Sequence, residues 1–98
     1  MFKIVQKNNT DSIEDFSGTW QELIDQKATV GDVSFLQINT ATSEIIGMPA
    51  KRVWSILVQR WSPNYWTALA IPYTAIETAK CYRAAKFGSG SYAGWIEV

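Results

Sequence analysis

The sequence predicts an α+β fold, with a mainly antiparallel sheet of about five to six strands and two helices packed on one face. Short runs of β-branched and aromatic residues recur between turn-forming residues and indicate strands. Two longer stretches instead repeat apolar residues every three or four positions, which is typical of amphipathic helices. Packing both helices on one sheet is the simplest way to bury both apolar stripes. The length of 98 residues predicts one domain spanning residues 1–98.

The first half of the chain is expected to form a strand, a helix and a hairpin. Residues 2–6 are apolar and β-prone, and they predict a first or edge strand. Residues 11–27 predict the first helix through an apolar stripe made of Ile13, Phe16, Trp20, Leu23 and Ile24. Residues 33–46 predict a hairpin, because two β-prone runs flank a short polar connection.

The central stretch, residues 51–71, holds three of the five tryptophans, and no acidic residue occurs from Ile45 to Ile76. Its secondary structure is ambiguous, because its apolar residues fit both the two-residue period of a strand and the 3.6-residue period of a helix. As strands, residues 53–61 and 65–71 form a hairpin around Ser62-Pro63-Asn64. As a helix starting at Pro49, the segment through residue 61 carries an apolar stripe with one arginine. The turn and the second β-prone run favour the hairpin, and the helix remains the alternative.

The last quarter of the chain predicts the second helix and a final strand. Thr74 and Glu77 have the spacing of a capping box, and an alanine-rich run follows them to Phe87. Gly88 is expected to end this helix. Residues 92–98 then predict the last strand, so the expected element order is β-α-β-β-β-β-α-β.

The charge is distributed unevenly, although the net charge is zero. Residues 1–48 carry three lysines against seven acidic residues, and residues 49–98 carry six basic residues against two acidic ones. Such asymmetry can mark an electrostatic partner, and it also suits two halves that neutralise each other across the fold. The single cysteine, Cys81, and the lack of a signal peptide or long apolar run predict a cytoplasmic protein without a membrane segment.

The residue types argue against catalysis. The chain has no histidine, which is the commonest general base and metal ligand. One cysteine cannot supply the sulfur ligands of a zinc site. We therefore predict a protein that is not an enzyme and that holds no metal or cofactor.

The preferred functional hypothesis is a small protein-interaction module, an inhibitor or adaptor of a larger macromolecular machine of the kind that phages and mobile elements encode. Aromatic and arginine side chains dominate the energetics of protein interfaces, and they gather around the predicted hairpin. The expected partner-binding residues are Lys51, Arg52, Arg60, Trp61, Tyr65 and Trp66. A second, acidic surface is expected on the first helix, formed by Asp11, Glu14, Asp15, Glu22 and Asp25. The alternative is that the aromatic rings only cap a small core.

Two nucleic-acid hypotheses and one oligomeric state also fit the sequence. Residues 42–61 can be laid on a helix-turn-helix whose basic residues face DNA, although a neutral domain is unusual for a DNA-binding protein. With the hairpin kept, Trp61, Tyr65 or Trp66 can stack on single-stranded bases while Arg60 contacts phosphate. An exposed edge strand at residues 2–6 can pair with a second copy to give a homodimer.

Overall fold

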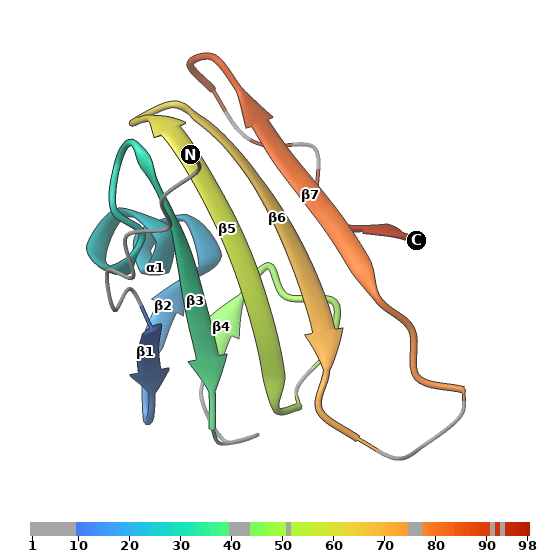
Figure 1. Cartoon of the computed structure of the whole chain (residues 1–98). Helices are drawn as coiled ribbons and strands as arrows, with labels where there is room; N and C mark the ends of the chain where they lie inside the picture. Colours follow the sequence, from blue (N-terminus) through green and yellow to red (C-terminus); the bar gives the residue numbers. More distant parts are fainter. Residues whose placement is uncertain (1–9, 40–43, 51, 75–77, 91, 93) are drawn as a thin grey trace, which may run out of the picture.

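The computed structural model describes residues 10–39, 44–50, 52–74, 78–90, 92 and 94–98, which form eight strands and one helix. Six strands make one sheet in the order β1-β3-β5-β6-β7-β8, and β2 and β4 make a second, small sheet (Figure 1). The elements in chain order are β1 (Thr10–Ile13), β2 (Ser17–Thr19), α1 (Trp20–Lys27), β3 (Asp32–Ile38), β4 (Glu44–Ile46), β5 (Trp54–Ser62), β6 (Tyr65–Pro72), β7 (Tyr82–Phe87) and β8 (Ile96–Glu97).

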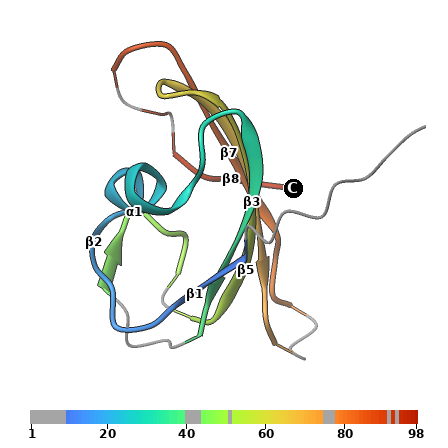
Figure 2. The same ribbon diagram turned by 60° about the vertical axis from the view of Figure 1, so that its left-hand side comes forward.

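The predicted fold class is wrong. The described residues hold one short helix instead of two, and the large sheet is mixed, because β1 runs parallel to β3. The small sheet is also parallel, with β2 beside β4. The molecule is therefore mostly sheet, and a single layer of other elements covers one face of the large sheet (Figure 2).

The first helix begins much later than predicted, at Trp20 instead of about residue 11. Thr19 is its N-cap and forms a capping box with Glu22, which satisfies the backbone N–H groups of both residues and fixes the start of the helix there. Upstream, Asp15 has a φ of 55°, in the left-handed region that does not continue a helix. The apolar positions still point inward, because Ile13 reaches the core from β1 while Trp20, Leu23 and Ile24 reach it from α1.

The predicted second helix is also wrong, since residues 82–87 form strand β7. This strand pairs with β6 in an antiparallel register that joins Ala70 to Tyr82 and Tyr65 to Phe87. The neighbouring strand supplies a hydrogen-bonding edge, and this tertiary context overrides the high intrinsic helix propensity of the alanines. Residues 75–77, including the expected capping-box Glu77, lie outside the described residues.

The hairpin predicted for the central stretch, residues 53–71, is confirmed. The hairpin predicted at residues 33–46 is not. β5 and β6 pair along their length and turn at Pro63 and Asn64. Strands do form at both ends of the predicted 33–46 hairpin, but β3 pairs with β5 and β1, whereas β4 pairs with β2. The strand predicted at residues 2–6 lies outside the described residues, and the last strand is reduced to Ile96–Glu97.

The core lies between the large sheet and the layer made by α1, β2 and β4 (Figure 2). Its largest side chains are three fully buried tryptophans, Trp20, Trp54 and Trp66. The ring of Trp20 packs edge-on against Trp66 at 6.0 Å and lies 5.1 Å from the ring of Trp95. The one helix of the described residues falls well short of the length and apolar character that crossing a lipid bilayer requires.

Candidate functional site

The predicted aromatic and basic surface is divided between the interior and the exterior. Arg60 and Trp66 are buried, with 6% and 1% of their surfaces exposed. Trp61 is 59% exposed, Tyr65 is exposed at the same end of the hairpin, and Arg52 is half-buried. Lys51 lies outside the described residues. Burial removes Arg60 and Trp66 from any surface that a partner could contact in this fold.

Arg60 fastens α1 to the sheet. Its Nη1 donates to the carbonyl oxygens of Ile24 and Ala28, at 3.1 Å each, at the C-terminal end of the helix, where the Ile24 carbonyl also accepts the backbone N–H of Ala28. Its Nη2 donates to the Asp25 carboxylate at 2.8 Å and to the carbonyl of Pro63 at 3.0 Å. The positive charge also complements the negative C-terminal end of the helix dipole. Arg60 is therefore a structural residue that joins the helix to the hairpin turn.

Trp66 lies on the same inner face of the sheet. Its indole N–H donates to the side-chain oxygen of Gln21 on α1 at 3.3 Å, and its ring lies 5.3 Å from that of Tyr92. Burial raises the pKa of the Tyr92 phenol above its ordinary value. These contacts account for Trp66 entirely as a core residue, as the alternative reading of the sequence had it.

The strand period explains this division. Along a strand, alternate side chains face opposite sides of the sheet, so Arg60 shares the inner face with Ile56 and Val58. The register then shifts between Arg60 and Ser62, and the extra residue at this β-bulge is Trp61. The Trp61 side chain faces outward, on the side of the sheet away from α1.

The five acidic residues do not share one helix face. Asp11 is in β1, and Glu14 and Asp15 follow β1 in the connection to β2. Only Glu22 and Asp25 are on α1, where Glu22 completes the capping box and Asp25 pairs with Arg60. The predicted acidic surface therefore does not form as a helical stripe, because the helix begins at Trp20.

The opposite face of the large sheet has no covering element among the described residues. Figure 2 shows α1, β2 and β4 all on one side, and Figure 1 looks toward the other side. We call this second side the open face. By register and alternation, its described members are Ser12 of β1, Val33, Phe35 and Gln37 of β3, Ser55, Leu57, Gln59 and Trp61 of β5, Tyr65, Thr67, Leu69 and Ile71 of β6, Arg83, Ala85 and Phe87 of β7, and Ile96 of β8.

The open face is apolar along its central row. Phe35, Leu57 and Leu69 stand directly opposite one another on three adjacent strands, and the same row continues through Arg83 on β7 to Ile96 on β8. Phe35 is 53% exposed although it lies mid-strand. Arg83 is the only formally charged side chain among the described members of the face. A solvated sheet face normally alternates with polar residues, and an apolar patch of this kind marks an interaction site.

Aromatic rings border the face at the end of the central hairpin. Tyr65 packs edge-on against Phe87 of β7, with ring centroids 5.2 Å apart, and Trp61 lies across the hairpin from them. Tyrosine and tryptophan are the residue types most enriched where interfaces gain their affinity. Trp61 and Tyr65, which the sequence had indicated, thus belong to a surface that is wider than the hairpin.

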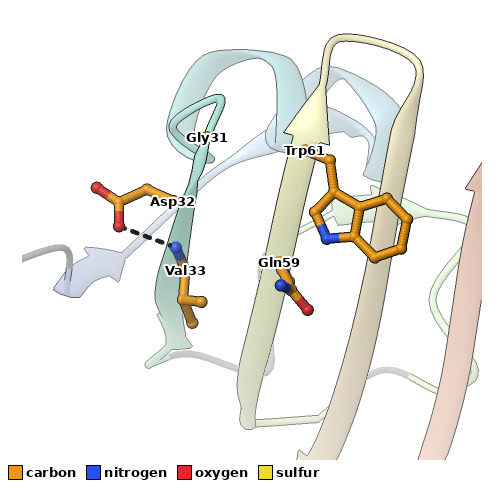
Figure 3. A pocket seen from close by; sticks show the side chains of 5 residues that line it. All are labelled: Gly31, Asp32, Val33, Gln59 and Trp61. Carbon is orange, nitrogen blue, oxygen red and sulfur yellow. Dashed lines mark hydrogen bonds between the residues drawn. The ribbon is translucent and has the colours of Figure 1, made fainter. Parts of the chain in front are cut away.

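One shallow hollow lies on the open face, and a second lies at its edge beside the turn before β3. The first, of about 170 Å³, lies over the centre of the β5–β6 pair and is lined by Leu57, Gln59, Thr67, Ala68 and Leu69. The second, of about 360 Å³, is lined by Gly31, Asp32, Val33, Gln59 and Trp61 (Figure 3). In Figure 3 the Trp61 indole extends from β5 toward β6, whereas the Asp32 carboxylate turns the other way and accepts a hydrogen bond from the Val33 backbone at 3.1 Å. Hollows of this shape suit protruding side chains of a partner.

Comparisons with protein-family models, with curated protein sequences and with solved structures gave no match. Within the described part of the chain, no three acidic or cysteine side chains come together in a group that could hold a metal ion.

The sequence contained a signal for the open face that the hairpin hypothesis did not use. In β3 the adjacent residues Phe35 and Leu36 are both large and apolar, and in β5 the run Ile56-Leu57-Val58 is apolar throughout. Adjacent apolar residues in a strand point to opposite faces, so a continuous apolar run indicates a strand that is covered on both sides. What the sequence could not show is that β3, β5 and β6 align these residues in one row.

Proposed function

We propose that this chain is a small protein-binding module, which acts as an inhibitor or adaptor by occupying or joining macromolecules rather than by catalysis. The binding surface is the open face, and its partner is a protein that presents an apolar surface with little charge. The observation that carries this proposal is the apolar row at the centre of the six-stranded sheet, in which Phe35 is exposed and Leu57 and Leu69 are half-buried although no described element covers them. The single cysteine supports an intracellular site of action.

The chemistry of the face favours protein over nucleic acid. A single-stranded nucleic acid needs several cationic side chains along its backbone in addition to aromatic stacking platforms. The described members of the open face offer Trp61, Tyr65 and Phe35 for stacking but only Arg83 as a cation. Recognition of duplex DNA by a helix-turn-helix at residues 42–61 would need a helix where β5 lies, so we do not carry that hypothesis forward.

Site-specific photo-crosslinking in cells that naturally produce the chain tests the proposal. A photoreactive amino acid at position 57 lies in the central row, and one at position 26 lies on the exposed side of α1 as a matched control. We expect a discrete protein adduct from position 57 that excess unmodified chain suppresses, and no such adduct from position 26. The absence of any adduct at position 57, or an adduct that nuclease removes, would overturn the proposal.

A further inference from the structure

We infer that the partner of the open face is a second copy of this chain, packed face to face about a two-fold axis that runs along the strands between β5 and β6. This inference rests on the proposed function, since it specifies which protein the face binds. Two apolar sheet faces stack about 10 Å apart, with their strands within about 30° of each other. The order β1-β3-β5-β6-β7-β8 places two strands on each side of the β5–β6 pair, so this axis passes through the middle of the sheet.

The residues of the open face complement themselves about this axis. The rotation places β5 over the second copy's β6 and β3 over its β7. Each row of residues aligned across the strands then lies over the same row of the second copy. In the central row, Leu57 then meets the Leu69 of the second copy, and Phe35 meets its Arg83. An arginine over an aromatic ring is a favourable cation–π contact, and the symmetry makes it twice.

The rows between the central row and the hairpin turn match in the same way. In the next row, Gln59 faces Thr67 of the second copy, where an amide and a hydroxyl can hydrogen-bond. At the hairpin end, Trp61 faces Tyr65 of the second copy, which joins two aromatic rings. In these three rows the face therefore pairs apolar with apolar groups, polar with polar groups, and its one cation with a ring, whereas at the other end of the hairpin Ser55 faces Ile71 of the second copy.

The charge decides between this axis and the other way of stacking the two faces. A two-fold axis that ran across the strands, along the central row, would place each strand over its own copy. The two Arg83 guanidinium groups would then lie nearest each other, in a contact from which water is excluded. Like charges facing each other across an interface oppose association, so the axis along the strands is favoured.

The size of the face is sufficient for a specific dimer. Strands about 4.8 Å apart with a rise of about 3.3 Å per residue give the six strands a projected area of roughly 500 Å². Two such faces bury at least about 1,000 Å² together, which is where specific interfaces begin. The net charge of zero means that two copies do not repel each other over a distance.

Sedimentation of the purified full chain tests the inference. The measurement covers concentrations from about 1 μM to about 1 mM, in the range of moderate to weak complexes, with reductant present so that Cys81 cannot link two chains. We expect the mass to rise with concentration toward twice that of one chain. A mass that stays monomeric throughout would overturn self-association, yet a protein adduct at position 57 in cells would still support the proposed function.

A charge exchange tests the pairing itself. Phe35→Lys sets two ammonium groups against two guanidinium groups and should weaken the dimer by about 100-fold. Adding Arg83→Glu to this variant converts both pairs into opposite charges and should restore at least about 10-fold of the lost affinity. Residues 35 and 83 are separated by β5 and β6 within one chain, so a rescue must act between chains. The control Gln26→Lys adds the same charge on α1 and should leave the dimer unchanged.

The other outcomes contradict the inference. A dimer that Phe35→Lys does not weaken uses another surface. A dimer that Phe35→Lys weakens but Arg83→Glu does not rescue has a different arrangement of the two faces. If the chain stays monomeric and Phe35→Lys instead increases amide hydrogen exchange in residues 1–9, the chain's own first residues occupy the face. Circular dichroism of each variant confirms that the fold is retained.

Discussion

The Nη2 atom of Arg60, on the central strand β5, lies 2.8 Å from the carboxylate oxygen Oδ1 of Asp25, on α1. This contact brings together the two charge classes that the sequence had assigned to separate binding surfaces. Both residues instead hold the helix layer against the sheet, together with the carbonyls of Ile24, Ala28 and Pro63. The surface left for a partner is therefore on the far side of the sheet.

Replacing Arg60 should destabilise the fold strongly. Arg60→Met keeps the length of the side chain but removes the guanidinium that donates to the carbonyls of Ile24, Ala28 and Pro63, of which Ile24 keeps the backbone N–H of Ala28, and we expect the free energy of unfolding to fall by about 3 kcal/mol. Urea unfolding followed by tryptophan fluorescence measures this loss. Arg60→Lys should lose about half as much, at roughly 1.5 kcal/mol, because one ammonium group cannot reach every acceptor.

The Asp25 partner provides the control for that prediction. Asp25 is 54% exposed, so water screens its attraction to Arg60. Asp25→Asn should cost less than about 1 kcal/mol. If Asp25→Asn destabilised the protein as much as Arg60→Met, the ion pair and not the carbonyl contacts would be the main stabilising interaction.

Two tryptophans of the central hairpin should respond to mutation in opposite ways. Trp66→Ala removes a ring that is fully buried against Trp20 and Tyr92, and it should cost about 4 kcal/mol or prevent folding. Trp61→Ala removes an exposed ring and should change the free energy of unfolding by less than about 0.5 kcal/mol. Thermal unfolding of the two variants, measured side by side, tests this difference. Equal losses of stability would place Trp61 in the core.

Gly47 should not tolerate a side chain. Its φ is 103°, and a Cβ there would collide with the hydroxyl of Tyr92. Gly47→Ala should therefore cost about 2 kcal/mol, from backbone strain and from this collision. Gly31 also has a positive φ but open space around it, so Gly31→Ala should cost only the backbone part, about 1 kcal/mol.

A double variant separates the two contributions at Gly47. Tyr92→Phe removes the hydroxyl oxygen, so Gly47→Ala should be less destabilising in the Tyr92→Phe background than in the natural chain. Denaturant unfolding of the natural chain, the two single variants and the double variant gives the coupling free energy between the two positions. Strict additivity would mean that the Tyr92 hydroxyl does not limit the space beside Gly47.

The buried Tyr92 phenol predicts a loss of stability at high pH. Burial raises its pKa above 10.0 in the folded chain. Above pH 10.0, the unfolded chain has released this proton while the folded chain still holds it, so the free energy of unfolding falls as pH rises. The contribution is fully present below that pH. Across alkaline pH, the free energy of unfolding should fall less steeply with pH for Tyr92→Phe than for the natural chain. Equal slopes would show that Tyr92 titrates alike in the folded and unfolded states.

The sequence by itself determined the local features whose signals lie within a few residues. The hairpin of β5 and β6 followed from its turn and its two β-prone runs, and the apolar positions of residues 13–24 indicated which side chains would be buried. The period of β5 also places Arg60 on the inner face with Ile56 and Val58, although its charge had suggested the outside.

Only the tertiary structure decided the partners of each strand and therefore the site. Residues 82–87 become a strand because β6 offers them an unpaired edge, which no local preference reveals. The pairing of β3 with β5 rather than β4 brings Phe35 beside Leu57. Strand pairing joins residues far apart in the chain, and its free energy depends on neighbours that a local window of sequence does not contain. For that reason the open face emerged only from the assembled sheet.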